Sequence, residues 1–312
     1  MNRRFYYLMG ILFLLATGCT KDFDIDPGEA APQYVIEGKI SNMRGPHYVR
    51  VTKAANRLGT DMPPLSGVDN AEAITGALVI IRDDMGMTDT LRPVPQSNRR
   101  YNPLYMGDRG YYGTTRLTGI PGHTYYLQVH IGSKVFQASA YMPATAPVID
   151  SVVLKKDPVA DPSGQRGDAA FAYFKEPRDE LNYYLLQHNI IADSAFEAAR
   201  VYFSYTSVFP LYVFDDKTLS PYVEGMQLRT IFADNFGNNR MEPYWFTPGD
   251  SLQVRLSSLT RNTYDYLKAL EKQFLDDGNV YRPTPASPTG NISGGALGLF
   301  WAANVSHKVY RP

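Results

Sequence analysis

The only cysteine of this 312-residue chain, Cys19, stands where an apolar N-terminal segment ends. The pair Arg3-Arg4 precedes an apolar stretch over residues 5–15, and the small residues 16–18 come directly before the thiol. A positive segment, a short apolar segment and a small-residue cleavage site are the parts of an export signal. The apolar stretch is shorter than the ~20 residues that a membrane-spanning helix needs. We therefore expect residues 1–18 to be a cleaved lipoprotein signal peptide.

The position of Cys19 predicts lipid attachment. A thiol between a cleavage site and the charged stretch that starts at Thr20 has no core to pack into, which disfavours the alternative of a buried structural cysteine. The several acyl chains of a bacterial lipoprotein anchor a protein far more firmly than one chain does. Since the sulfur is then a thioether, no cysteine is left for a disulfide, a metal or nucleophilic catalysis.

Residues 19–33 are polar, acidic and rich in turn formers, and we expect them to be a lipidated tether. The alternating carboxylates Asp22, Asp24 and Asp26 also suggest a calcium loop. However, Gly28 does not follow the third carboxylate directly, and Gln33 stands where a bidentate glutamate belongs. The tether is the preferred interpretation.

No motif identifies a reaction. The chain lacks His-Glu-x-x-His, Gly-x-Ser-x-Gly, a phosphate loop and paired-cysteine metal spacing. Its five histidines are scattered, at positions 47, 123, 130, 188 and 307. Adjacent aspartates at 83–84, 215–216 and 276–277 resemble a catalytic carboxylate pair, but in turn-like sequence such side chains are normally solvated. We predict no catalytic residue, no metal site and no cofactor.

Aromatic residues suggest two contact regions. Tyr244, Trp245 and Phe246 are consecutive, and an extended segment cannot point all three inward, so at least one is expected to face solvent or a partner. Trp301 lies in a small-residue strand over 296–303, after a loop over 281–295 that is rich in proline and glycine. That loop either closes over a ligand or only lets the strand approach another backbone. These four aromatics are the predicted ligand or partner contacts.

Residues 34–144 predict a β-sandwich domain. The expected strands are 34–41, 47–52, 76–81, 124–131 and 134–140. The last two form the clearest hairpin, because apolar and polar residues alternate and Gly132-Ser133 supplies the turn. Regular strands with turn signals are typical of a sandwich. Residues 117–129 resemble the closing strands of immunoglobulin-like or carboxypeptidase-regulatory-like modules.

A boundary follows at Pro143 to Pro147, where two prolines bracket small residues. Residues 145–312 predict a second β-rich domain with one helix near 260–275, so the whole chain is expected to be mainly β. The expected strands are 149–155, 170–175, 182–191, 200–205 and 251–257. Their pattern leaves open whether they form a complete sandwich or an open sheet.

Charge argues against one class of partner. Lysine plus arginine and aspartate plus glutamate both number 31. Removing the two signal-peptide arginines leaves the mature chain slightly acidic, so nucleic acid is not an expected partner. A chain of this length buries a full core without disulfides.

Four segments, together with the cysteine, resemble a known family. They are Val35–Ser41, Val79–Asp84, Tyr264–Glu271 and Asn291–Gly298. In order and spacing they are similar to the Bacteroidetes lipoproteins grouped as domain of unknown function 4249, over nearly the whole mature chain. The resemblance implies an outer-membrane lipoprotein that faces the surface or the periplasm and is often encoded beside a TonB-dependent receptor. It implies no substrate and no catalytic residue, so only lipidation at Cys19 is carried over.

Four tripeptides resemble the O-glycosylation pattern of secreted Bacteroidetes proteins. They begin at Asp89, Asp150, Asp193 and Asp250. Our hypothesis is that at least one of them is modified.

These observations predict a non-enzymatic accessory lipoprotein of the outer membrane, held by its lipid anchor and facing the cell surface. It would bind an unknown small ligand, or cap a TonB-dependent receptor in nutrient uptake. Two alternatives from other classes stay open. One is a surface hydrolase whose acid/base pair no motif reveals, and the other is a structural or adhesive surface protein.

Overall fold

The computed structural model describes residues 33–53, 71–94, 110–155, 168–177, 180–191, 212–228, 232–235, 240–243, 246, 248–275 and 288–311. Residues 32–312 form one compact unit. The described part of this unit is mainly β-structure with one helix, which confirms the predicted fold class. In these segments, no helix has the length and apolar character needed to span a lipid bilayer.

The first part of the unit contains strands β1 to β9. Their bounds are β1 Tyr34–Ser41, β2 Tyr48–Lys53, β3 Glu72–Ala73, β4 Leu78–Asp83, β5 Thr88–Thr90, β6 Arg92–Pro93, β7 Tyr111–Gly113, β8 Thr124–Ile131 and β9 Lys134–Tyr141. One four-stranded sheet has the order β5-β4-β8-β9. Strands β1, β2, β7 and β6 belong to a larger sheet, with β3 paired to β2.

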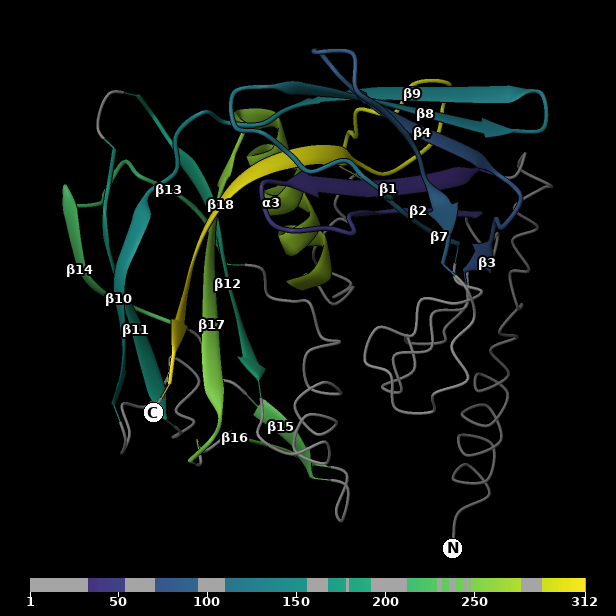
Figure 1. The fold of residues 1–312 in the computed structure, drawn as a ribbon. Coiled ribbons are helices and arrows are strands. Elements are labelled where there is room, and N and C mark those ends of the chain that lie inside the picture. The colour runs from purple at the N-terminus through teal and green to yellow at the C-terminus, as the bar shows by residue number, and fades with distance from the viewer. Residues whose placement is uncertain are drawn as a thin grey trace, which may run out of the picture. The chain divides into compact units, whose positions relative to one another are not determined.

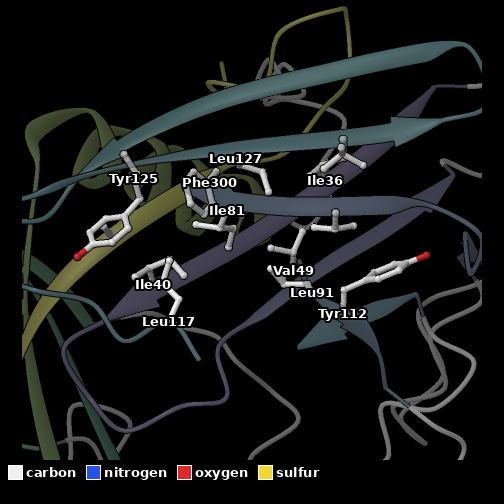
Figure 2. Close-up of a cluster of buried hydrophobic side chains, with 14 of the residues drawn as sticks. Ile36, Ile40, Val49, Ile81, Leu91, Tyr112, Leu117, Tyr125, Leu127 and Phe300 are labelled. Carbon is white, nitrogen blue, oxygen red and sulfur yellow. The ribbon is translucent and has the colours of Figure 1, made fainter. Parts of the chain in front are cut away.

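These two sheets enclose a hydrophobic core, as predicted for a sandwich. Side chains alternate along each strand, so that Ile36 and Ile40 of β1 and Tyr125 and Leu127 of β8 all point into the same core. Figure 2 shows these side chains between the two layers, together with Phe300 from the distant end of the chain. The core therefore includes a residue far beyond the predicted N-terminal strands.

The second part contains strands β10 to β18 and helix α3. Their bounds are β10 Val148–Lys155, β11 Ala169–Lys175, β12 Tyr183–Ile191, β13 Tyr212–Asp215, β14 Tyr222–Gln227, β15 Phe232–Asn235, β16 Arg240–Pro243, β17 Ser251–Leu259, α3 Arg261–Leu275 and β18 Phe300–Tyr310. Sheet β10-β11-β14 packs against β13-β12-β17-β18, and the core between them includes Phe174, Tyr184 and Leu256. This resolves the open alternative in favour of a second sandwich. The strand predicted at 200–205 lies outside the described residues.

Helix α3 covers the other side of the second sandwich. Thr260 caps it, because its hydroxyl accepts a hydrogen bond from the N–H of Thr263 at 3.3 Å. Tyr264 and Leu267 lie one turn apart and pack with Leu185 of β12. The helix predicted near 260–275 is thereby confirmed.

Strand β18 belongs to both sandwiches. Its first residues pair in parallel with β1, from Gly38↔Phe300 to Ser41↔Ala303. From Asn304 onward it pairs antiparallel with β17. Figure 1 shows the yellow strand running from the side of β1 to the side of β17. It starts later and runs further than the predicted 296–303 strand. The division of the chain at residue 144 stays a prediction.

Candidate functional site

The solvent-facing side of sheet β5-β4-β8-β9 carries two exposed tyrosines. Tyr126 of β8 is 41 % exposed and Tyr141 of β9 is 45 % exposed. In the register of the hairpin, Tyr126 faces Ser139 and Tyr141 faces Thr124, which makes the two tyrosines diagonal neighbours on one face. We call these four residues and Arg82 the tyrosine face.

Arg82 completes the tyrosine face on the β4 side. It lies opposite Tyr126 in the register of β4 and β8. Its guanidinium carbon is 5.6 Å from the centroid of the Tyr126 ring, within the range of a cation–π contact. The Tyr126 side chain stays 41 % exposed beside this contact. The surface therefore offers aromatic rings, hydroxyls and one positive charge.

Apolar side chains extend this surface. Leu78 and Val135 lie on either side of His130, two rows from Tyr126 on the same face, and they are 47 % and 43 % exposed. Met85 and Met87, in the turn between β4 and β5, are 64 % and 51 % exposed. Neighbouring exposed apolar groups of this kind are typical of a surface that contacts another molecule.

A shallow polar hollow of about 590 Å³ lies at β5, the edge strand of the same sheet. Its lining residues are Thr88, Asp89, Thr90, Arg92, Thr115 and Arg116. The hydroxyl and guanidinium groups suit a polar ligand. Thr90 is exposed and belongs to one of the tripeptides that resemble a glycosylation pattern.

Asp89 has a structural role. Its Oδ2 accepts hydrogen bonds from the backbone N–H groups of Thr115, Arg116 and Leu117 at 2.8, 2.7 and 2.9 Å. Its Oδ1 accepts the Thr115 hydroxyl at 2.5 Å. Burial opposes ionisation, but these hydrogen bonds outweigh it and lower the pKa of Asp89. The carboxylate organises the loop after β7, and the neighbouring side chains line the hollow.

Three of the predicted site residues, Cys19, Tyr244 and Trp245, lie outside the described residues. The fourth, Phe246, is 5 % exposed and packs in the core of the second sandwich. Its backbone N–H donates to Asp168 Oδ2 at 2.9 Å. The Phe246 side chain therefore serves packing, and a contact role for this aromatic segment stays a prediction.

Trp301, the last predicted contact, is half-buried among residues that pack beneath α3. Lys39, its neighbour across β1 and β18, places its ammonium 4.5 Å from the centroid of the Trp301 ring. Burial, followed by repulsion from Arg255, lowers the pKa of Lys39 to about 8. The indole thus packs against a partly desolvated lysine. A partner contact at Trp301 stays a prediction.

The described part of the loop before β18 is structural. A side chain at Gly290 would overlap the carbonyl of Gly298, and one at Gly298, whose φ is +104°, would overlap the carbonyl of Ile36. Asn291 holds the loop by donating to the carbonyls of Ser139 and Phe300 at 2.9 and 2.7 Å. These glycines let the backbones approach, as one of the two alternatives predicted.

The aspartate pairs behave differently from one another. Asp83 accepts the N–H groups of its own turn, and Asp84 lies 2.7 Å from His123 Nδ1 at the surface. Asp215 pairs with Lys217 at 3.1 Å. Asp216 instead shares the side-chain amide of Asn182 with Glu176, a carboxylate that sequence reasoning did not single out. In the described residues, no group of three or more histidine, cysteine, aspartate or glutamate side chains is placed to hold a metal.

Glu176 lies at the end of β11, is 5 % exposed and accepts the Tyr184 hydroxyl on Oε1 at 2.7 Å. Burial, partly offset by that hydrogen bond and reinforced by Asp216, raises the pKa of Glu176 to about 6. Its Oε2 is shielded from solvent and accepts no hydrogen bond. No local motif could reveal this pair, because the turn before β14 brings Asp216 to Glu176 from 40 residues away.

Comparison with known proteins places the chain in a family. A search of curated proteins finds no match. A family model does match, and it covers residues 20–309, nearly all of the chain after the predicted signal peptide. The four segments noted in the sequence all lie within this range. The chain therefore belongs to the family described as domain of unknown function DUF4249.

Proposed function

We propose that this chain is a non-enzymatic accessory lipoprotein of the outer membrane, tethered at Cys19 and facing the cell surface. In this proposal it partners a TonB-dependent uptake system, either by binding its ligand or by capping the receptor. The N-terminal signal pattern supports the anchor, and the tyrosine face supports the binding role.

The tyrosine face is the observation on which the binding role rests. Two tyrosines on one rigid sheet offer large contact area at a low cost in side-chain entropy, and their hydroxyls remain available for hydrogen bonds. Arg82 adds a charge beside them. Such a surface contacts a partner without remodelling the strands beneath it, since Tyr125 and Leu127 anchor β8 in the core.

The structure lends less support to the hydrolase alternative. Glu176 and Asp216 are two carboxylates that share one amide donor, and Glu176 is only 5 % exposed. General acid catalysis requires the carboxyl to lie within hydrogen-bond reach of the reacting group of a substrate. The tyrosine face is accessible, whereas Glu176 is not.

Co-purification tests the proposed partnership. Native protein is isolated from detergent-solubilised outer membrane, and TonB-dependent receptors in the eluate are identified by mass spectrometry. We expect a receptor with the natural chain and a several-fold lower yield with the double variant Tyr126→Ala/Tyr141→Ala. Tyr222→Ala is the matched control, because Tyr222 is 40 % exposed on β14 of the other sandwich. Absence of any receptor, or equal yields from the double variant, would reject the partnership.

The lipid anchor is tested separately with Cys19→Ser. We expect this change to abolish fatty-acid labelling and to move the protein out of the membrane fraction, because the acylated sulfur is lost. A serine variant that stays in the membrane and keeps its label would disprove the tether.

A further inference from the structure

One end of the second sandwich gathers oxygen atoms around two carboxylates that share one amide donor. Glu176 directly follows β11, and Asp216 follows β13 in the turn that leads to β14. Backbone hydrogen bonds fix both places: the N–H of Glu176 donates to Pro221 O at 2.9 Å, and the N–H of Asp216 donates to Asn182 O at 3.2 Å. The side-chain amide of Asn182 lies against both carboxylates, so the fold keeps two like charges close to each other.

The side-chain amide of Asn182 lies at the centre of this end. Its Nδ2 is surrounded by four oxygens, at 3.3, 3.1, 2.9 and 3.1 Å, which we call the oxygen cluster. They are Glu176 Oε1, Pro177 O, Glu180 O and Asp216 Oδ2. An amide has two hydrogens, so four acceptors exceed what it can satisfy. The nitrogen and oxygen of an amide exchange places by half a turn of the side chain.

A second observation points to a missing positive group. Glu176 is only 5 % exposed, so it is more than nine-tenths buried, and its Oε2 accepts no hydrogen bond. In the part of the chain that the structure describes, neither Glu176 nor Asp216 forms an ion pair with a basic side chain. A buried charge without a partner is costly, so natural proteins pair such groups or use them to coordinate metals.

The surroundings are acidic as well. Burial, reinforced by the nearby carboxylates of Glu176, Asp216 and Glu180, raises the pKa of Tyr184 far above its ordinary value. The Tyr184 hydroxyl therefore stays protonated and donates to Glu176. These three neighbouring carboxylates give this end of the sandwich a negative potential, which attracts a cation.

We propose that the oxygen cluster binds a divalent cation of the calcium type. Its ligands come from two carboxylates, two backbone carbonyls and one amide side chain, namely Glu176, Asp216, Pro177, Glu180 and Asn182. Carboxylate, carbonyl and amide oxygens are the ligands that Ca²⁺ takes in proteins, in six- to eightfold and flexible coordination. Mg²⁺ demands a near-ideal octahedron and gives up its water reluctantly, so the cluster favours the larger ion.

Calcium at this place would join the ends of three strands. It would bridge the end of β11, the start of β12 and the turn after β13, which are otherwise joined by backbone hydrogen bonds and by the side chains of Asn182 and Tyr184. A bound ion stabilises the folded state by mass action, since the unfolded chain lacks the site. The inference is independent of the tyrosine face, which lies on the other sandwich.

The test uses the mature, full-length protein in detergent, first stripped with EDTA. We expect about 10 mM Ca²⁺ to raise the Tm by several degrees, with a Kd of about 10⁻⁴–10⁻³ M, as in extracellular calcium modules. An equal concentration of Mg²⁺ should have a clearly smaller effect. Tb³⁺ replaces Ca²⁺ as a luminescent probe, and tyrosine excitation should sensitise it, because the Tyr184 hydroxyl is 2.7 Å from Glu176 Oε1.

Variants assign the response to the cluster. Glu176→Gln and Asp216→Asn should each weaken the Ca²⁺ response at least tenfold. Both should also fold, because each removes one of two like charges that lie against the same amide. Asp215→Asn is the matched control, since Asp215 is adjacent in sequence but pairs with Lys217 at 3.1 Å. It should bind Ca²⁺ as the natural protein does.

Two results would overturn the proposal. One is a natural protein whose Tm does not respond to millimolar Ca²⁺ and that shows no sensitised Tb³⁺ luminescence. The other is a Ca²⁺ response that stays undiminished in both Glu176→Gln and Asp216→Asn. Stabilisation by acid alone, without any effect of Ca²⁺, belongs to the first result and would mean that the two carboxylates only share a proton.

Discussion

Asp89 of the first sandwich and Glu176 of the second are both buried carboxylates beside loops, and their environments are opposite. Asp89 in the first sandwich is 1 % exposed, and both of its oxygens accept hydrogen bonds from the loop at 115–117. Glu176 in the second sandwich is 5 % exposed, but one oxygen is unpaired and the other shares an amide donor with a second carboxylate. Burial penalises both charges alike, and donors compensate for it only at Asp89.

This difference separates a completed structural site from an incomplete one. The three N–H groups that Asp89 accepts belong to consecutive residues of one loop, so a single carboxylate satisfies a whole turn. Glu176 has one hydroxyl and one shared amide as donors. The first sandwich needs nothing from outside at this position, whereas the second gains from a proton or a cation.

The largest expected effect is the loss of Asp89. Asp89→Ala leaves the N–H groups of Thr115, Arg116 and Leu117 without their acceptor, and we expect the free energy of unfolding to fall by about 3 kcal/mol. Urea unfolding monitored by tyrosine fluorescence measures it. Asp84→Ala is the control, because that carboxylate lies at the surface and should matter far less. Equal losses in both variants would contradict the structural role of Asp89.

Acid provides a second measurement of the same carboxylate. The folded state lowers the pKa of Asp89, so its contribution is present above the ordinary aspartate pKa of about 3.9 and is lost as the pH falls through the lowered value. Asp89→Asn should therefore show a shallower loss of stability on acidification than the natural chain. If the free energy of unfolding falls equally steeply on acidification in both proteins, the pH dependence does not come from Asp89.

The next largest effect concerns Glu176 and is measured in EDTA. Here the free energy of unfolding depends on pH in the opposite direction to that expected for Asp89. Its folded pKa of about 6 lies above its ordinary value of 4.5, so the free energy of unfolding should fall by about 2 kcal/mol as the pH rises through this window. Glu176→Gln should remove this dependence and be more stable than the natural chain at neutral pH. Urea unfolding at pH 4.5 and pH 7 decides it, and unchanged pH dependence in the variant would assign the effect to another group.

The smallest expected effect comes from the amide between the two carboxylates. Asn182→Ala removes the donor that Glu176 and Asp216 share, and we expect a loss of about 1 kcal/mol in EDTA. Asn182→Asp adds a third carboxylate and should lose more stability in EDTA while responding more strongly to Ca²⁺. Thermal unfolding with and without Ca²⁺ compares the two, and equal responses would remove Asn182 from the cluster.

Local patterns predicted the regular elements of the chain well. The hairpin of β8 and β9 lies within one residue of its predicted bounds, because alternation with period two is written into the strand itself. Helix α3 follows from the spacing of Tyr264 and Leu267, which places them on one face. The burial of Phe246 was not foreseen, since a run of three aromatics does not show which of them points inward.

The amino-acid sequence by itself determined the mainly β character, the helix near the C-terminus and the family to which the chain belongs. Only the tertiary structure decided that β18 completes both sandwiches, that Arg82, Tyr126 and Tyr141 share one exposed face, and that Glu176 meets Asp216. The physical reason is the distance along the sequence over which each kind of interaction acts. Periodicity and turn chemistry act over a few residues, whereas these contacts join residues that lie 15 to 262 positions apart and meet only when separate strands pack.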